Sequence, residues 1–472
     1  RGLQDRLSLV IAKSVIEHFD AGVAATESIA ATARHGALGR VDGWHPGLSV
    51  LAAMANVLPW LDAADRPRAV THAGVRVATD TADRAPRHPL PALSKSGRSR
   101  EGLRAWFRET VEVRDGAGAE RVLATIVAEH GPRAALDAVL AACTDHRYTD
   151  VGHTLDYAIK CSELCDYLEG RGEELISILF TSLVPQLVQM QRMEETAAWR
   201  RPIDVAALVE RFEPELARAF DPAAATTAAA AAAESGVDEP ELVELLLGDE
   251  PAKSVEALFE RMAGGASPVA LAEAVVTTAT RRVLHFGTAN ELADWDTVHH
   301  TLTYANAVAE GMRRAPSAEL FRAVLDGAMS VYLDRFLNVP AATLPGDRTG
   351  SGGGRSPEAL LDALLASYDG RSNVDGATDL SWAFLSAGGE PRELLRALGT
   401  AILREDSGQH EFQELELAWR RLDRRGDGAE PARLALVATA RWVAARYPTP
   451  RAREQTFSIA RRLQRGEPLY AG

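Results

Sequence analysis

Apolar residues recur at intervals of three and four along nearly the whole chain of 472 residues, while alternating runs of β-branched residues are scarce. This spacing places apolar side chains on one face of an α-helix, whereas a half-buried strand needs strict alternation. Signals for helix starts are frequent, for example Ser267 before Pro268 and Ser356 before Pro357. The pattern predicts an all-α protein.

Two segments of the chain are similar to each other. His153 opens HTLDYAIKCSEL and His300 opens HTLTYANAVAEG, so that His, Thr, Leu, Tyr and Ala recur at the same offsets, 147 residues apart. Weaker copies open at His45 (HPGLSVLAAMAN) and at His410 (HEFQELELAWRR), and a second apolar helical stretch follows each copy. The similarity predicts about four copies of one helical module, stacked around a central cavity so that neighbours bury each other's apolar faces.

Two segments have the composition of connectors. Residues 220–240 are rich in alanine and end in a Gly/Asp/Pro break, and residues 346–357 are rich in Gly and Ser. They divide the chain into N-terminal modules (1–219), a central module (241–345) and a C-terminal module (358–472). Because the repeats occur on both sides of the connectors, we expect one continuous body.

Charge and cysteine content exclude several classes of function. The net charge of −14 opposes binding to nucleic-acid phosphates, and no apolar run approaches the roughly 20 residues of a membrane span. The first residues lack a signal-peptide pattern. We therefore expect a cytoplasmic protein with no nucleic-acid or membrane partner, and a homo-oligomer stays open. Three cysteines are too few for a disulfide framework or a cysteine-rich metal cage, which points any metal chemistry toward histidine.

Histidines at equivalent helix starts form the strongest functional pattern. His45, His153, His300 and His410 begin the four copies of the module, so a closed stack could bring their imidazoles around one axis. Imidazoles that point into a common cavity suit a transition metal such as iron. The alternative is that each histidine caps or packs at the head of its module.

Other histidines rank behind these. His72 lies in the second helical stretch of the first module among small and apolar residues, where it is either a ligand from a second helix or a buried, hydrogen-bonded residue. His285 and His299 are secondary candidates. Neighbouring residues on a helix point about 100° apart, so the repeat selects His300 rather than His299.

One lysine lies in the expected histidine helix. Only four of the 52 Lys and Arg residues are lysine, and Lys160 shares a helical stripe with His153. A half-buried lysine is neutralised by a lowered pKa, by an ion pair, or by carboxylation with CO2, which creates an oxygen donor for a metal. From the residues alone we favour an ion pair with Glu163. Asp156 and Tyr157, one turn from the histidine, are candidates to orient a ligand or the substrate.

Several segments resemble the questin oxidase-like family and its all-helical non-haem iron relatives. They are HPGLSVLAAMANVLPWL, THAGVRVA, GHTLDYAIKCSELCDYL, DWDTVHHTLTYANAV and DRFLNVPAATLP, and they span most of residues 45–345. The resemblance implies an oxygenase of polycyclic aromatic polyketides whose metal is held by several histidines and a carboxylated lysine. Carried over to this sequence, the resemblance implies the ligands His45, His72, His153, Lys160 and His300.

The expected function is a mononuclear non-haem iron oxygenase that uses Fe(II) and O2 on an aromatic, polyketide-like small molecule. Ring cleavage, Baeyer–Villiger-like insertion and hydroxylation all stay open as outcomes. The chain lacks the Cys/His pairs of a Rieske cluster, so electrons have to come from the substrate or from a separate reductant. One rival is a non-enzymatic helical-repeat scaffold. Another is a hydrolase with a carboxylated lysine between two metals, for which paired Asp/Glu ligands are not evident.

Overall fold

The computed structural model describes residues 1–39, 43–196, 204–212, 214, 216, 218, 220, 237–347, 354–370 and 373–468. Over these ranges the chain forms α-helices and short 3-10 turns without any β-strand, which confirms the all-α prediction. The helices are α1 (Ser8–Asp20), α2 (Ala25–Leu38), α3 (Pro46–Val57), α4 (Arg66–Asp80), α5 (Arg100–Glu112), α6 (Gly116–Thr144), α7 (His153–Tyr167), α8 (Glu173–Thr181), α9 (Val184–Gln189), α10 (Met193–Thr196), α11 (Val205–Glu210), α14 (Glu239–Leu247), α15 (Pro251–Ala263), α16 (Pro268–Leu284), α17 (Leu292–Arg314), α18 (Ala318–Asp334), α19 (Pro357–Ser367), α20 (Val374–Ser386), α21 (Pro391–Arg404), α22 (Gln409–Arg425), α23 (Glu430–Ala444) and α24 (Ala452–Gln464). The 3-10 turns are η1 (Leu58–Trp60), η2 (Thr149–Gly152), η4 (Arg335–Leu337) and η5 (Pro345–Asp347).

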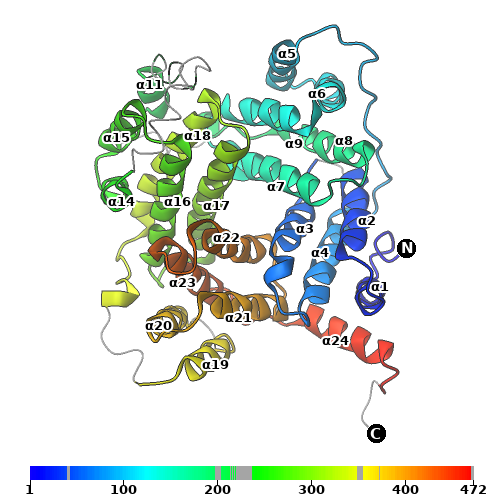
Figure 1. Cartoon of the computed structure of the whole chain (residues 1–472), viewed down its shortest axis with the longest axis vertical. Helices are drawn as coiled ribbons and strands as arrows, with labels where there is room; N and C mark the ends of the chain where they lie inside the picture. Colours follow the sequence, from blue (N-terminus) through cyan, green and yellow to red (C-terminus); the bar gives the residue numbers. More distant parts are fainter. Residues whose placement is uncertain are drawn as a thin grey trace.

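The helices include four modules, each of three helices that follow one another in the chain. The modules are α2–α4, α6–α8, α16–α18 and α21–α23, and in each the middle helix packs against both of its neighbours in the chain. The middle helices are α3, α7, α17 and α22. His153, His300 and His410 lie in the last three, and His45 is the residue before α3. The expected helical module is therefore present in the fold (Figure 1).

The four middle helices form the centre of the molecule. Helix α3 packs against α7 and α22, and α17 packs against the same two helices, so that the four close into a ring (Figure 1). Apolar faces of these helices belong to one hydrophobic cluster that runs from Ile11 to Tyr447. The interior of the ring also holds buried polar side chains, among them Lys160 and Glu163. The candidate site lies where the repeated histidines meet.

The two expected connectors fall largely outside the described residues. Residues 221–236 of the connector 220–240 are not described, and α14 already begins at Glu239. Residues 348–353 of the connector 346–357 are also outside the description, and α19 begins at Pro357.

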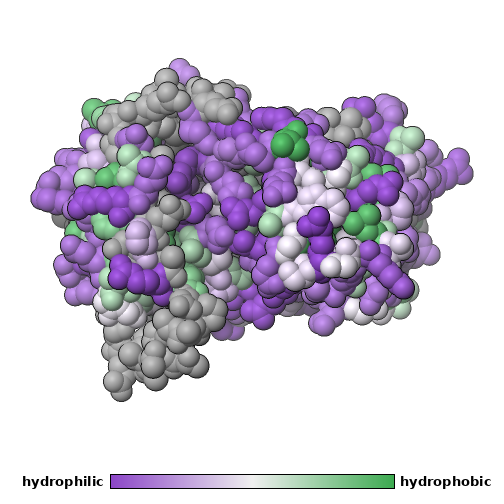
Figure 2. Space-filling view, turned by 90° about the horizontal axis from the view of Figure 1, so that it is seen from above, coloured by the Kyte–Doolittle hydropathy of each residue, from purple (hydrophilic) through white to green (hydrophobic). Residues whose placement is uncertain are grey.

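The outer surface of the molecule is mainly polar on the face that Figure 2 presents. Hydrophilic residues cover most of this face, and the hydrophobic ones lie in small separate groups. Among the helices that the structure describes, none combines the length and the apolar character that a membrane span requires.

Candidate metal centre

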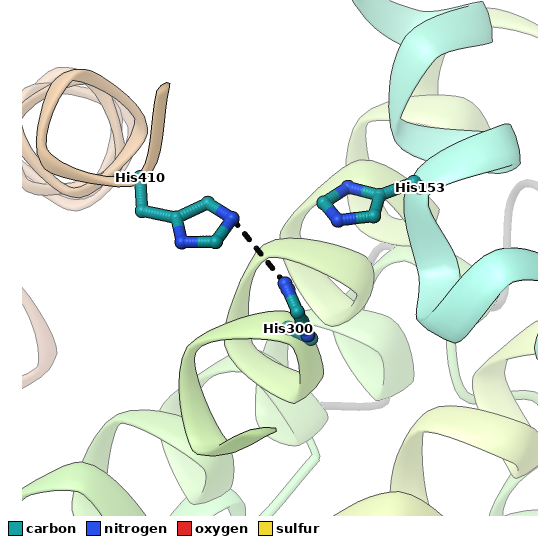
Figure 3. A group of neighbouring side chains, drawn as sticks. All are labelled: His153, His300 and His410. Atoms are coloured by element: carbon teal, nitrogen blue, oxygen red, sulfur yellow. Dashed lines mark hydrogen bonds between the residues drawn. The ribbon is translucent and has the colours of Figure 1, made fainter. Parts of the chain in front are cut away.

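Three histidines from three modules point toward one another. His153 begins α7, His300 lies in the middle of α17, and His410 is the second residue of α22 (Figure 3). One ligand nitrogen from each lies within 4.8 Å of the other two. Residues more than 100 positions apart in sequence thus form one compact group, as the repeat led us to expect for His153 and His300.

The spacing of the nitrogens suits one metal ion. The Nε2 atoms of His300 and His410 are 3.3 Å apart. Two nitrogens that are each about 2.1 Å from one ion lie about 3.0–3.4 Å apart at octahedral or tetrahedral angles. Two imidazole lone pairs facing each other at this distance repel unless a proton or a metal ion lies between them. The His300–His410 pair therefore has the spacing of two ligands of one ion, and with His153 the group could hold a single metal ion.

A carboxylate orients one of the three imidazoles. Asp296 lies one helical turn before His300 and its Oδ1 is 3.0 Å from Nδ1 of His410. Although burial opposes ionisation, His410 and Arg446 together hold the pKa of Asp296 below its ordinary value. The carboxylate thus accepts the Nδ1 proton of His410 and leaves the Nε2 lone pair facing the group. Arg446 pairs with the same oxygen of Asp296, which completes the kind of hydrogen-bonded support that metal-binding histidines have.

Two of the imidazoles are held in the neutral form. Burial lowers the pKa of His153 to about 4, with a further contribution from His410. Burial and the neighbouring His153 and His410 lower the pKa of His300 to about 3. Neutral imidazole is the form that binds a metal ion, so no proton has to be displaced from these two residues at neutral pH.

A left-handed turn places His153 at the start of its helix. Tyr148, Asp150 and Val151 have φ values of 44°, 48° and 51°, and Gly152 has φ of 97°. The Asp150 carboxylate ties the turn together, because it accepts hydrogen bonds from Thr154, from Gln186 and from the backbone N–H of Gln191. Such backbone strain persists only where surrounding contacts over-determine it, and it is common at functional sites.

Substitution of Gly152 by alanine is expected to be costlier than its backbone conformation alone explains. A Cβ at this position lies 2.9 Å from Cβ of Tyr304. Gly170 serves as the control, because its φ of 84° is also positive and nothing lies within 4 Å of a Cβ there. We expect Gly170→Ala to lower the free energy of unfolding by about 1–3 kcal/mol, and Gly152→Ala by at least about 1 kcal/mol more. Urea unfolding measures both, and equal losses would contradict the steric argument.

A pocket of about 330 Å³ opens beside the three-histidine group. Tyr157 lies in its wall, and its ring stacks on that of His153 with centroids 5.5 Å apart. The Tyr157 hydroxyl bonds to Gln409, and burial raises the pKa of that hydroxyl, so it stays protonated. The pocket is lined by Gly43, Trp44, His45, Pro46, Asp80, Arg84, Asp150, His153, Tyr157 and Gln186.

His45, an expected ligand, lies in this pocket wall but outside the three-histidine group. It is the residue before α3, and both of its ring nitrogens face other acceptors. Nε2 is 3.2 Å from the carbonyl oxygen of Gly36, and Nδ1 is 3.3 Å from Oδ2 of Asp80. Binding of a metal ion would require His45 to give up one of these contacts.

The remaining candidate histidines are also placed outside the group. His72 is buried, with its Nε2 3.0 Å from the carbonyl oxygen of Leu403, and burial lowers its pKa to about 3. This is the buried, hydrogen-bonded alternative. His299 is fully buried and contacts Glu414 at 2.8 Å, while His285 contacts the carbonyl oxygen of Ala342.

Lys160 lies in an ionic environment rather than among the three histidines. Its Nζ is 3.0 Å from Oε2 of Glu163 and 2.5 Å from Oε2 of Glu416. Although burial opposes the charged form, these two carboxylates raise the pKa of Lys160 above its ordinary value. Carboxylation by CO2 requires the neutral amine, so this environment favours the ion pair. Glu163 is the partner that we favoured from the residues alone.

Asp156, expected to orient a ligand, instead accepts a hydrogen bond from Gln413 at 2.5 Å. Burial raises the pKa of its carboxyl from 3.8 to about 7. The folded chain therefore binds a proton that the unfolded chain has already released above pH 3.8. The resulting stabilisation is complete below the unfolded pKa and is lost as the pH rises through about 7.

Between pH 5 and pH 8 we expect this carboxyl to lower the free energy of unfolding by about 2–3 kcal/mol. Asp156→Asn keeps a group that pairs with Gln413 but has no proton to lose in this range. Urea unfolding of both chains at the two pH values checks the prediction. A variant that loses as much stability as the natural chain would show that Asp156 does not titrate there.

Sequence reasoning undervalued His410 and missed Asp296 and Arg446. A signal for Asp296 was available, because it precedes His300 by four residues and therefore lies on the same helix face. Arg446 follows α23 and reaches the site only through the packing of the fourth module.

Comparisons with known proteins do not extend the assignment. No protein-family model matches the chain, and neither a curated protein nor a solved structure gave a match. The similarity to the questin oxidase-like family stays a prediction from sequence segments. The geometry of the site is that of a three-histidine group that could hold one metal ion.

Proposed function

We propose that the chain is a mononuclear non-haem iron oxygenase that acts on an aromatic small molecule. The observation that carries the proposal is the convergence of His153, His300 and His410 on one point beside a pocket. Imidazole donors suit iron as well as zinc and copper, and three of them leave coordination positions free for O2 and substrate. Bound Fe(II) would supply the electron-transfer chemistry that lets O2 react with an electron-rich aromatic ring.

The residues of the chain have separate roles in this proposal. Asp296 keeps the Nδ1 proton on His410 and so directs its Nε2 lone pair toward the centre. The ring of Tyr157 stacks on the ring of His153 and forms part of the pocket wall. Trp44 lies in the same wall, where it is almost completely buried and donates its Nε1–H to Ser49.

Anaerobic loading of the metal-free protein tests the function. We expect one Fe(II) per chain by elemental analysis, and O2 consumption when a hydroquinone or a larger polyphenol is added. A protein that binds no iron would overturn the proposal. Preferential binding of zinc with no O2 consumption would overturn the oxygenase assignment and indicate hydrolytic chemistry, since three histidines also form the ligand set of catalytic zinc.

A further inference from the structure

A group of buried side chains lies further along the same helices that carry the histidines. We call it the ionic cage, and its members are Asn56 of α3, Lys160 and Glu163 of α7, and Glu416 and Arg420 of α22. The side chains of its four charged members are at most 4% exposed. Charges this deep are stable only when they are paired and hydrogen-bonded.

The two carboxylates of the cage bind the same three donors. Glu163 accepts hydrogen bonds from Lys160 at 3.0 Å, from Asn56 at 2.9 Å and from Arg420 at 2.7 Å. Glu416 accepts from Asn56 at 2.6 Å and from Arg420 at 2.7 Å, and pairs with Lys160 at 2.5 Å. Helices α3, α7 and α22 are therefore cross-linked through both carboxylates.

The fourth helix of the ring, α17, joins the cage through Glu310. Glu310 of α17 is 3.1 Å from Arg420, and it is also 3.2 Å from Arg424 near the surface. Helices α7, α17 and α22, which carry the three histidines, are thus linked to one another through Lys160 and Arg420.

The cage continues a regular pairing between α7 and α22. Four pairs of side chains follow in the same order along both helices: His153 with His410, Asp156 with Gln413, Lys160 with Glu416, and Glu163 with Arg420. A slip of one residue moves a helix by 1.5 Å and turns it by about 100°, so it would break all four pairs together. The ionic pairs therefore define the same register that brings His153 opposite His410.

Loss of one cage cation would disturb this register. The two buried carboxylates would then have one cation fewer to compensate their charge, and uncompensated charge in the interior is strongly unfavourable. Helices α7 and α22 would then have to separate or rotate to admit water. Because metal ligands must be placed within a few tenths of an ångström, such a movement changes metal affinity.

We propose that the ionic cage is the positioning device of the three-histidine centre, with Lys160 as its central cross-link. The inference rests on the proposed metal site. In the ionic cage, Lys160 acts as a charged ammonium that sets the relative placement of His153 and His410, and it does not itself bind the metal.

The test compares metal affinity in two variants of α7. Lys160→Met removes the cross-link but keeps the length of the side chain, whereas Leu164→Ala removes a fully buried apolar side chain one turn away. Both should lower stability. Titration of the metal-free full chain with Co(II), followed by its visible absorption, is expected to show a dissociation constant raised about 10–100-fold and altered bands for Lys160→Met. For Leu164→Ala we expect the dissociation constant to stay within about twofold.

A second variant keeps the inference testable if Lys160→Met does not fold. Asn56→Ala removes one shared donor from both carboxylates and leaves every charge paired, so it should fold and weaken Co(II) binding several-fold. If the natural chain binds Co(II) and the cage variants bind it with unchanged affinity and spectrum, the inference is overturned and the proposed function still stands. A natural chain that binds neither Co(II) nor Fe(II) would overturn both.

Discussion

Replacing His300 by alanine is expected to weaken metal binding by more than about 100-fold, since even an outer-shell partner of a metal ligand contributes 10–100-fold. The imidazole of His300 lies between the other two: its ring centroid is 4.6 Å from that of His153 and 4.9 Å from that of His410. Its removal leaves two donors, too few to hold a divalent ion against water and buffer. Titration with Fe(II) under anaerobic conditions, or with Co(II), measures the loss.

Two other histidines serve as matched controls for this prediction. His72→Ala and His45→Ala remove imidazoles that the sequence resemblance places in the ligand set but the structure places outside the group. We expect both variants to bind the metal within about threefold of the natural chain. The His72 variant should nevertheless lose stability, because that side chain is buried and bonds to Leu403. Loss of metal from either control, together with loss from the His300 variant, would favour the ligand set implied by the resemblance.

The all-α fold and the repeated module could be predicted because both depend on local patterns. Apolar spacing identifies helices, and identical residues at equal offsets identify equivalent helices. For the same reason His153 and His300 could be paired from their sequence segments alone, since each opens a nearly identical stretch. A shared helix face then brings them to the same end of the ring.

The fourth module could not be recognised with the same ease, because its contacts are complementary rather than alike. Where α7 has Lys160 and Glu163, α22 has Glu416 and Arg420. Buried charges on two facing helices need partners of opposite sign, so the contacting positions of the two helices carry different residues. The sequence similarity between the modules is therefore lost at these positions. His410 thus lies in a weak copy of the repeat although it belongs to the three-histidine group.

The ligand role of His45 and the environment of Lys160 depend on tertiary neighbours that local patterns do not reveal. His45 occupies the corresponding end of its module, yet Asp80 from the next helix and Gly36 from the preceding one face its nitrogens. For Lys160, spacing along the helix indicates Glu163 but not Glu416, which is more than 250 residues away.

Arg420→Met is expected to lower the free energy of unfolding by about 3–5 kcal/mol, because removal of this shared partner leaves three buried carboxylates with too little compensating charge. The guanidinium of Arg420 contacts Glu163, Glu416 and Glu310, and all four side chains are at most 4% exposed. Charged partners on three sides raise the pKa of Arg420 further above its ordinary value although burial opposes the charged form. Urea unfolding at pH 7 measures the change.

Replacing arginine by methionine at an exposed ion pair shows how much of the loss of stability depends on burial, because the change in charge is the same. Arg34 pairs with Glu174 at 3.0 Å, but the two side chains are 42% and 69% exposed. An exposed pair contributes at most about 1 kcal/mol, so Arg34→Met should change stability by no more than that. Because salt screens exposed charges and hardly reaches buried ones, 1 M NaCl should reduce the small effect at Arg34 and leave the large one at Arg420. Equal losses at the two positions would mean that the ionic cage is open to water, and the helix register would then have to depend on apolar packing alone.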